Sequence, residues 1–204
     1  KGEELPWAID PESGILAHAN NLMVEPGAKD FVTLNVDAAP GYRHDRIVEL
    51  LAATPKHDEA TFRRVQADLF SPRAKLLLPR WLEDLGDDAE LTPKARLAVE
   101  LLKTWKGEAS ADDPAPTIFF ATWRAAIRHA LRDELTEDAI RFFLAQRYST
   151  STSDHWFELP THPVWDDTAT PQIESRGQVV RSALEAAVLG LWTELGEDVA
   201  SWTW

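Results

Sequence analysis

The chain has 204 residues, enough for one large domain or for one domain with an appendage. Its hydrophobic content of 44% and its nine Trp can supply a sizeable core, which excludes a disordered tail. The formal net charge of −13 argues against nucleic acid and an anionic membrane surface as partners, and the absence of Cys excludes disulfides, zinc–thiolate sites and Cys nucleophiles.

The first 40 residues are predicted to form strands and loops. Residues 10–14 (DPESG) have the composition of a turn, because Pro and Gly favour turn dihedrals, and they lead into the short apolar run of residues 15–21. One further β-like run, residues 31–36, is flanked by Pro and Gly. Segments this short do not form a sheet by themselves.

From Tyr42 onward, apolar residues recur at helical spacing. Helices are predicted to begin near residues 42, 59, 72, 93, 117, 137 and 177. Ser71 and Thr92 are N-cap residues, and each precedes a Pro, which favours the first helical position. Gly86 and Gly196 follow apolar stripes as C-caps. The sequence therefore predicts a mainly α fold, with a multi-helix domain over residues 41–204.

Residues 149–177 are predicted to form an irregular loop, since Ser, Thr, Pro and Asp dominate their composition. A loop of this length is usually functional or packed on another part of the molecule. Within it, His155, His162, Asp166 and Asp167 could be drawn together as a metal site. No predicted helix orders them, so we expect no metal site there.

Two stretches of the chain resemble the penicillin acylase family of N-terminal-nucleophile hydrolases. They are residues 10–26 (DPESGILAHANNLMVEP) and residues 41–51 (GYRHDRIVELL). The stretches RVQADLFSPRAKLLLPRWL, LLKTWKGEASADD and LGEDVASWTW extend the likeness, in order, over nearly the whole chain. The resemblance implies an internal fragment of the β chain. In it, residues 1–40 belong to an αββα Ntn-hydrolase sheet, and residues 41–204 form an α-helical domain.

The resemblance also implies an activity, the hydrolysis of a linear amide. In the family, autoproteolysis exposes a Ser at the start of the β chain, and its own α-amino group serves as the base. This chain begins with Lys1. We therefore expect the isolated chain to be inactive and its partners to be the α chain, the rest of the β chain and a small acyl-amide substrate. The family points to the periplasm or the extracellular space. Three acyl groups stay open for the substrate: phenylacetyl, fatty acyl and glutaryl.

Site residues are carried over from the resemblance one by one. Asn20 matches the Asn whose amide binds the oxyanion, and Asn21 is the alternative if the register shifts by one. Arg46 matches an Arg near the amino group of the nucleophile, with Arg43 as the neighbouring candidate. Asp30 lies near a position that ligates calcium in some members. No cofactor is expected to be required, although a structural calcium in the full-length protein is compatible with the family.

Each of these residues has a simpler interpretation. An Asn pair after a strand is often a turn, because Asn tolerates the left-handed conformation. The residues HDR at 44–46 form an ordinary solvated first helical turn, and His18 is an ordinary strand residue. The alternative function is a non-catalytic, acidic α-helical module that binds a protein partner through residues 149–177.

Overall fold

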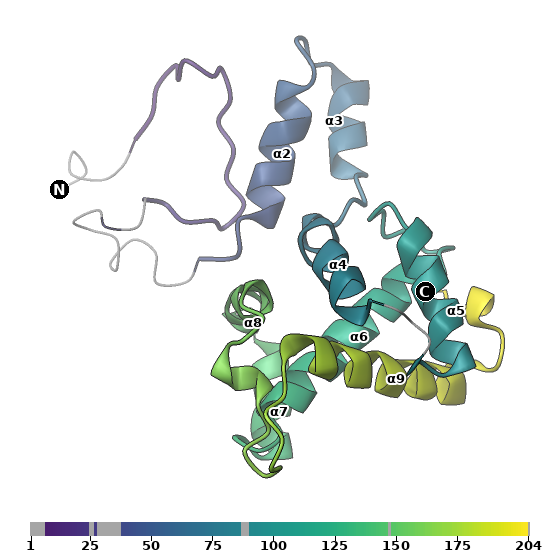
Figure 1. Ribbon diagram of the computed structural model, residues 1–204. Coiled ribbons are helices and arrows are strands. Elements are labelled where there is room, and N and C mark those ends of the chain that lie inside the picture. The colour runs from purple at the N-terminus through teal and green to yellow at the C-terminus, as the bar shows by residue number, and fades with distance from the viewer. Residues whose placement is uncertain (1–6, 25–26, 28–37, 87–89, 147, 204) are drawn as a thin grey trace. The chain divides into compact units, whose positions relative to one another are not determined.

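The computed structural model describes residues 7–24, 27, 38–86, 90–146 and 148–203. Over these residues the chain is mainly α-helical, as predicted, and Figure 1 labels the helices. The chain divides into two compact units, Lys1–Asp68 and Leu69–Trp204. The sequence predicted a different boundary, at residue 40, between sheet-forming and helical residues of a larger enzyme. That boundary stays a prediction.

The first unit holds two helices, α2 (Tyr42–Ala52) and α3 (Glu59–Gln66). Helix α3 begins at residue 59, as predicted, and its N-cap is Asp58, whose carboxylate accepts from the backbone N–H of Thr61 at 2.8 Å. Among the described residues of this unit, only Ala19 and Thr61 are buried. The described part of this unit therefore depends on polar contacts and half-buried side chains rather than on a large core.

No strand forms within residues 7–24 and 38–40 of the first unit. Residues 15–21, predicted as a short strand, form a loop with bends instead. Residues 31–36, the other predicted strand, lie outside the described residues. A strand forms only where a neighbouring strand accepts and donates its backbone hydrogen bonds. That residues 1–40 belong to an αββα sheet of the larger enzyme therefore stays a prediction.

The second unit is a set of packed helices (Figure 1). In its described part these are α4 (Pro72–Leu85), α5 (Pro93–Thr104), α6 (Pro114–Leu131), α7 (Glu137–Ala145), α8 (Tyr148–Glu158) and α9 (Arg176–Leu195), with the 3₁₀ turns η3 (Pro163–Trp165) and η4 (Val199–Ser201). The contact between α6 and α9 is the most extensive, and α4 and α5 also pack against α9. None of the described helices has the length and apolar composition of a membrane span.

Side-chain caps fix where these helices begin. Ser71, Thr92 and Asp113 each accept from a backbone N–H of the first turn, and each precedes a Pro at the start of the helix. Gly86 and Gly196 end α4 and α9 with positive φ, which Gly adopts without Cβ strain. The caps at Ser71 and Thr92 and the two Gly ends confirm the predictions, whereas α6, capped by Asp113, begins about one turn earlier than predicted.

Aromatic rings form the centre of the second unit. Trp81 stacks on Phe119 with 4.7 Å between ring centroids, and it meets Phe157 at 5.3 Å. Phe157 in turn meets Trp165 at 5.0 Å. All four side chains are buried. Because they come from α4, α6, α8 and η3, their packing joins four separate elements.

A buried ion pair links three helices of this unit. Arg176, at the start of α9, donates through Nε and Nη2 to the two carboxylate oxygens of Asp84 at 2.5 and 2.9 Å. Its Nη1 donates to the backbone carbonyl of Phe157 at 2.5 Å. The guanidinium therefore joins the ends of α4 and α8 to α9 with bidentate geometry.

The predicted loop over residues 149–177 is wrong in its first part, where α8 forms. Ser149 and Ser153 face inward and are buried, and the Ser153 hydroxyl donates to the Ser149 carbonyl at 2.6 Å. Phe157, one turn further on, is fully buried. The inner face of this helix is thus partly made of hydroxyl groups that bond to nearby backbone carbonyls, so an apolar pattern did not reveal it. Residues 159–175 are irregular apart from η3.

Candidate functional site

The residue predicted to bind the oxyanion lies in a tight turn of the first unit. Asn20 has a φ of +60°, in the left-handed region that Asn tolerates better than most residues. Its backbone carbonyl accepts from the N–H of Ala39 at 2.6 Å, which ties the turn to the residues before α2. Ala19 is buried, whereas Asn20 is exposed. The turn therefore holds the Asn20 side chain at the surface of its unit.

Arg43, in the first turn of α2, fixes the orientation of the Asn20 amide. Its Nη2 donates to Asn20 Oδ1 at 2.8 Å and to the carbonyl of Ala19 at 2.7 Å. Because a guanidinium has only donors, the amide atom that faces it must be the oxygen. The other end of the amide is the nitrogen Nδ2, and none of the described residues accepts a hydrogen bond from it.

This arrangement presents a neutral N–H donor beside a fixed positive charge. An amide can donate to developing negative charge without titrating. A hydrogen bond to Oδ1 polarises the amide, which strengthens Nδ2 as a donor. Asn20 and Arg43 together can therefore stabilise an oxyanion that is brought to Nδ2.

Asn21, the alternative to Asn20, uses both ends of its amide inside the turn. Its Oδ1 accepts from the N–H of Ala19 at 3.0 Å, and its Nδ2 donates to the carbonyl of Leu22 at 3.0 Å. An N–H can only donate and a carbonyl can only accept, so these partners fix the orientation of the amide. Of the two neighbours, Asn20 is the one whose Nδ2 has no acceptor among the described residues.

Arg46, predicted to lie near the amino group of the nucleophile, binds carboxylates of its own unit. Its Nε and Nη2 donate to the two Asp68 oxygens at 2.9 and 2.7 Å, and its Nη1 lies 3.0 Å from Glu49. The hydrogen bond with Asp68 raises the pKa of Arg46 above its ordinary value. The structure thus brings Arg43 to Asn20 and ties Arg46 to the residues after α3. The predicted role of Arg46 stays a prediction.

Sequence reasoning left Arg43 as the second choice and did not single out Asp68. Arg43 and Arg46 are three residues apart, so they share one face of α2, and spacing alone does not tell which reaches the turn. Asp68 lies 22 residues after Arg46, beyond any local pattern. The available signals were the place of Asp68 in the stretch RVQADLF, which carries part of the family likeness, and its position just after the end of α3.

The side chains considered as metal ligands lie apart or have other partners. Asp30 is outside the described residues, so its predicted calcium role stays a prediction. His155 is exposed on α8, and His162 Nδ1 accepts from the backbone N–H of Val164 at 3.1 Å as the cap of η3. Within the described part of the chain, no group of three or more His, Asp and Glu side chains is arranged to hold a metal ion.

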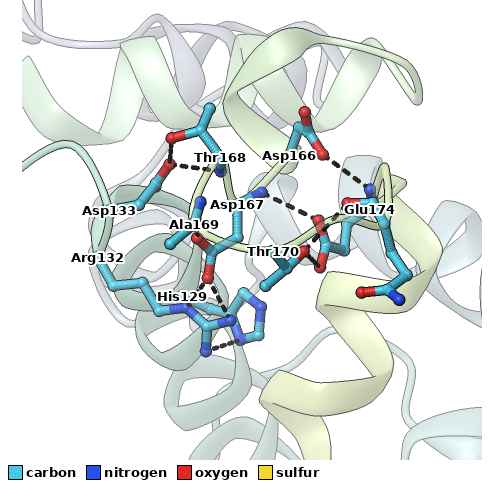
Figure 2. Close-up of polar contacts among 10 residues, drawn as sticks. His129, Arg132, Asp133, Asp166, Asp167, Thr168, Ala169, Thr170 and Glu174 are labelled. Atoms are coloured by element: carbon cyan, nitrogen blue, oxygen red, sulfur yellow. Dashed lines mark hydrogen bonds and ion pairs between the residues drawn. The ribbon is translucent and has the colours of Figure 1, made fainter.

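The irregular residues 159–175 are organised by a network of polar side chains, which Figure 2 shows. Asp133, just after α6, accepts from the N–H and the hydroxyl of Thr168 at 2.9 and 2.8 Å. Burial opposes the ionisation of Asp133, but these hydrogen bonds prevail and lower its pKa. Glu174 accepts from the Thr170 hydroxyl at 2.9 Å and from the N–H of Asp167 at 3.0 Å, and both bonds lower its pKa. These carboxylates therefore satisfy donors of the loop itself.

Arg132 is the cation that faces this network (Figure 2). Its Nε and Nη2 lie 2.8 and 2.6 Å from Oδ2 of the buried Asp167. His129 lies beside it, with Nδ1 3.5 Å from Arg132 Nη1. Burial lowers the pKa of His129, and the charge of Arg132 adds to that shift. The uncharged form of His129 is therefore the one that fits this environment.

Comparison with known proteins gives the following matches. The family model described as penicillin amidase matches residues 1–204. The chain is 32% identical over 191 residues to penicillin acylase 2 proenzyme of Pseudomonas sp. (strain SE83), covering 93% of this chain and 24% of that protein. It is 28% identical over 215 residues to the acyl-homoserine lactone acylase QuiP of Pseudomonas aeruginosa, covering 98% and 25%. The same protein of Pseudomonas fluorescens (strain Pf0-1) is also 28% identical, with 98% and 26% covered. The chain thus spans about a quarter of the length of these relatives.

Proposed function

Because this chain belongs to the penicillin amidase family, we propose that it forms part of an enzyme that hydrolyses a linear amide bond between an acyl group and an amine. Its contribution to the reaction is the amide of Asn20, which donates to the oxyanion. The hydrogen bond from Arg43 to Asn20 Oδ1 carries this proposal, because it occupies the amide oxygen and leaves Nδ2 without an acceptor among the described residues. The relatives, a penicillin acylase and acyl-homoserine lactone acylases, support the class of reaction.

In the proposed reaction the nucleophile is an N-terminal Ser that this chain does not supply. Its α-amino group takes the hydroxyl proton as the oxygen attacks the amide carbonyl. The carbonyl oxygen becomes negative and accepts from Asn20 Nδ2. The proton then passes to the leaving nitrogen, the amine departs, and an ester-linked acyl-enzyme remains. Water attacks this ester, the acid is released, and the Ser hydroxyl is restored.

The rest of the enzyme supplies the nucleophile, the sheet that holds it and most of the acyl pocket. The length of the relatives, about four times that of the matched region, supports this division. The 204-residue chain alone is therefore expected to hydrolyse no amide. The choice among phenylacetyl, fatty acyl and glutaryl groups falls to residues outside it.

The alternative, a non-catalytic module that binds a protein partner through residues 149–177, has less support. The first part of that segment is helix α8, whose inner face is buried. In the remainder, the carboxylates of the network bond to donors of the loop itself (Figure 2). These contacts account for the composition of the segment without a partner.

The test is the kinetics of the complete enzyme with Asn20 replaced. Asn20→Gly removes the amide but keeps the backbone freedom that a φ of +60° requires, whereas Asn20→Asp puts a carboxylate where negative charge develops. We expect kcat to fall by about 10²–10³ in Asn20→Gly, a loss of about 3–4 kcal/mol of transition-state stabilisation, and at least as far in Asn20→Asp. KM should change far less, because the donor acts mainly in the transition state.

Rates are compared per processed active site, counted by mass spectrometry, with a phenylacetyl anilide and an N-acyl-homoserine lactone as probes. The matched control is His18→Ala, an exposed neighbour of the turn that should keep the wild-type kcat. If processed Asn20→Gly keeps more than about a third of the wild-type kcat, the oxyanion role is wrong and Asn20 is an ordinary turn residue.

A further inference from the structure

We infer that Asn21 is a positioning residue for this reaction: it does not touch the substrate, but its side chain holds the turn that aims the Asn20 amide. The inference rests on the proposed function of Asn20. It is carried by the two hydrogen bonds of the Asn21 side chain, one to the residue before Asn20 and one to the residue after Asn21.

The peptide groups around Asn20 are held from several sides. Asn21 Oδ1 accepts from the N–H of the buried Ala19, and Arg43 Nη2 donates to the carbonyl of the same residue. The carbonyl of Asn20 itself accepts from Ala39. Asn21 is the only one of these partners within the turn, so its amide sets the path of the chain from residue 19 to residue 22.

That path matters because Asn20 lies in the left-handed region. Asn enters this region more readily than most residues, but other backbone conformations are also open to it, so its surroundings decide whether it stays there. If the Asn21 side chain is removed, the backbone of Asn20 is free to relax, and Nδ2 moves away from the position of the oxyanion. A displacement of about 1 Å is enough to lower a rate substantially.

The experiment is a double-mutant cycle in the complete enzyme, made of wild type, Asn21→Ala, Asn20→Gly and the double variant. We expect Asn21→Ala to lower kcat about tenfold while KM changes by less than about twofold. In the Asn20→Gly background there is no amide left to aim, so Asn21→Ala should have no further effect on kcat. Asn21→Asp keeps the acceptor for Ala19 and loses the donor to Leu22, so it should recover part of the lost kcat.

A wild-type kcat in Asn21→Ala, or additive losses in the double variant, would overturn the inference and leave the proposed function standing. If Asn20→Gly itself keeps the wild-type kcat, the oxyanion role fails and the positioning role fails with it. Thermal melting and the fraction of processed sites distinguish a variant that fails to fold from one that folds but holds the Asn20 amide in the wrong orientation. A variant that stays unprocessed is compared by its rate of self-cleavage, which passes through a similar tetrahedral intermediate.

Discussion

Each of the two units of this chain is stabilised internally by a different kind of interaction. In the first, Lys1–Asp68, two described residues are buried, and the turn of Asn20 is held by directional hydrogen bonds. In the second, Leu69–Trp204, buried Trp and Phe side chains join the helices into one core. Packing is tolerant of direction, whereas a hydrogen bond is not. The comparison teaches that the stability of the fold and the orientation of the Asn20 amide depend on different residues. The second unit should govern the free energy of unfolding, and the first should govern the geometry of the candidate site.

The largest stability effect should come from the core of the second unit. Trp81→Ala removes a ring that is 1% exposed and stacks on Phe119. We expect a loss of about 3–5 kcal/mol in the free energy of unfolding, measured by urea denaturation followed by circular dichroism. Trp7→Ala, in the first unit, is the matched control, because Trp7 is 73% exposed and its removal should change stability by less than about 0.5 kcal/mol. Equal losses in the two variants would break the comparison.

A second large effect should follow from the buried ion pair. Arg176→Ala leaves the Asp84 carboxylate without its bidentate partner and the Phe157 carbonyl without its donor. We expect a loss of about 2–3 kcal/mol, somewhat below that of a fully buried pair because the Asp84 side chain is 16% exposed. Arg141→Ala removes an exposed pair with Asp138 and should cost less than about 1 kcal/mol in the same denaturation experiment. A loss as small as that of the control would show that packing alone holds these helices.

A smaller effect is expected from the ion pair of the first unit. Arg46→Ala removes both hydrogen bonds to Asp68, and these join α2 to the residues after α3. We expect a loss of about 1 kcal/mol, seen as faster hydrogen exchange in α2 with little change in the second unit. Arg63→Ala is the control, since its pair with Glu59 is exposed and local to α3. Uniformly faster exchange in both units would mean that they do not unfold separately.

The smallest effect should appear on acidification. Burial and then the charge of Arg132 hold the pKa of His129 below its ordinary value of 6.5. The unfolded chain therefore binds a proton at His129 more readily than the folded chain does. Stability from this residue is complete above pH 6.5 and falls as the pH drops through that value toward the folded pKa. Melting temperatures of wild type should thus fall relative to those of His129→Gln between about pH 7 and about pH 5. Parallel curves would contradict the assignment.

Much of the second unit could be predicted from the sequence, because its helix boundaries are local. An oxygen-bearing side chain before a Pro, as at Ser71 and Thr92, satisfies a free N–H, and Gly196 accepts positive φ at the other end. Helix α8 was missed for a physical reason. Its buried face carries Ser149 and Ser153, whose hydroxyls donate to the backbone carbonyls of Gln146 and Ser149, so burial at these two positions is not accompanied by apolar side chains.

The candidate site was predictable only in part. Family likeness pointed to Asn20, and its exposed position and its amide, bonded only through Oδ1 among the described residues, are compatible with that role. The choice between Arg43 and Arg46 depended on which cation meets the turn and which meets Asp68, and both partners are distant in sequence. Periodicity places both Arg side chains on one helix face but carries no information about what lies opposite.

The left-handed backbone of Asn20 also restricts which amino acids this position can accept. Besides Gly, the residues that enter this region most readily are Asn, Asp and His. Gly has no side chain, Asp repels a developing oxyanion, and His is larger and titrates near neutral pH. The longer or branched donors Gln and Thr are poorly suited to positive φ. Among these residues, Asn is the one that combines a neutral hydrogen-bond donor with ready access to the left-handed conformation. A library of all twenty residues at position 20, selected for activity in the complete enzyme, should therefore return Asn.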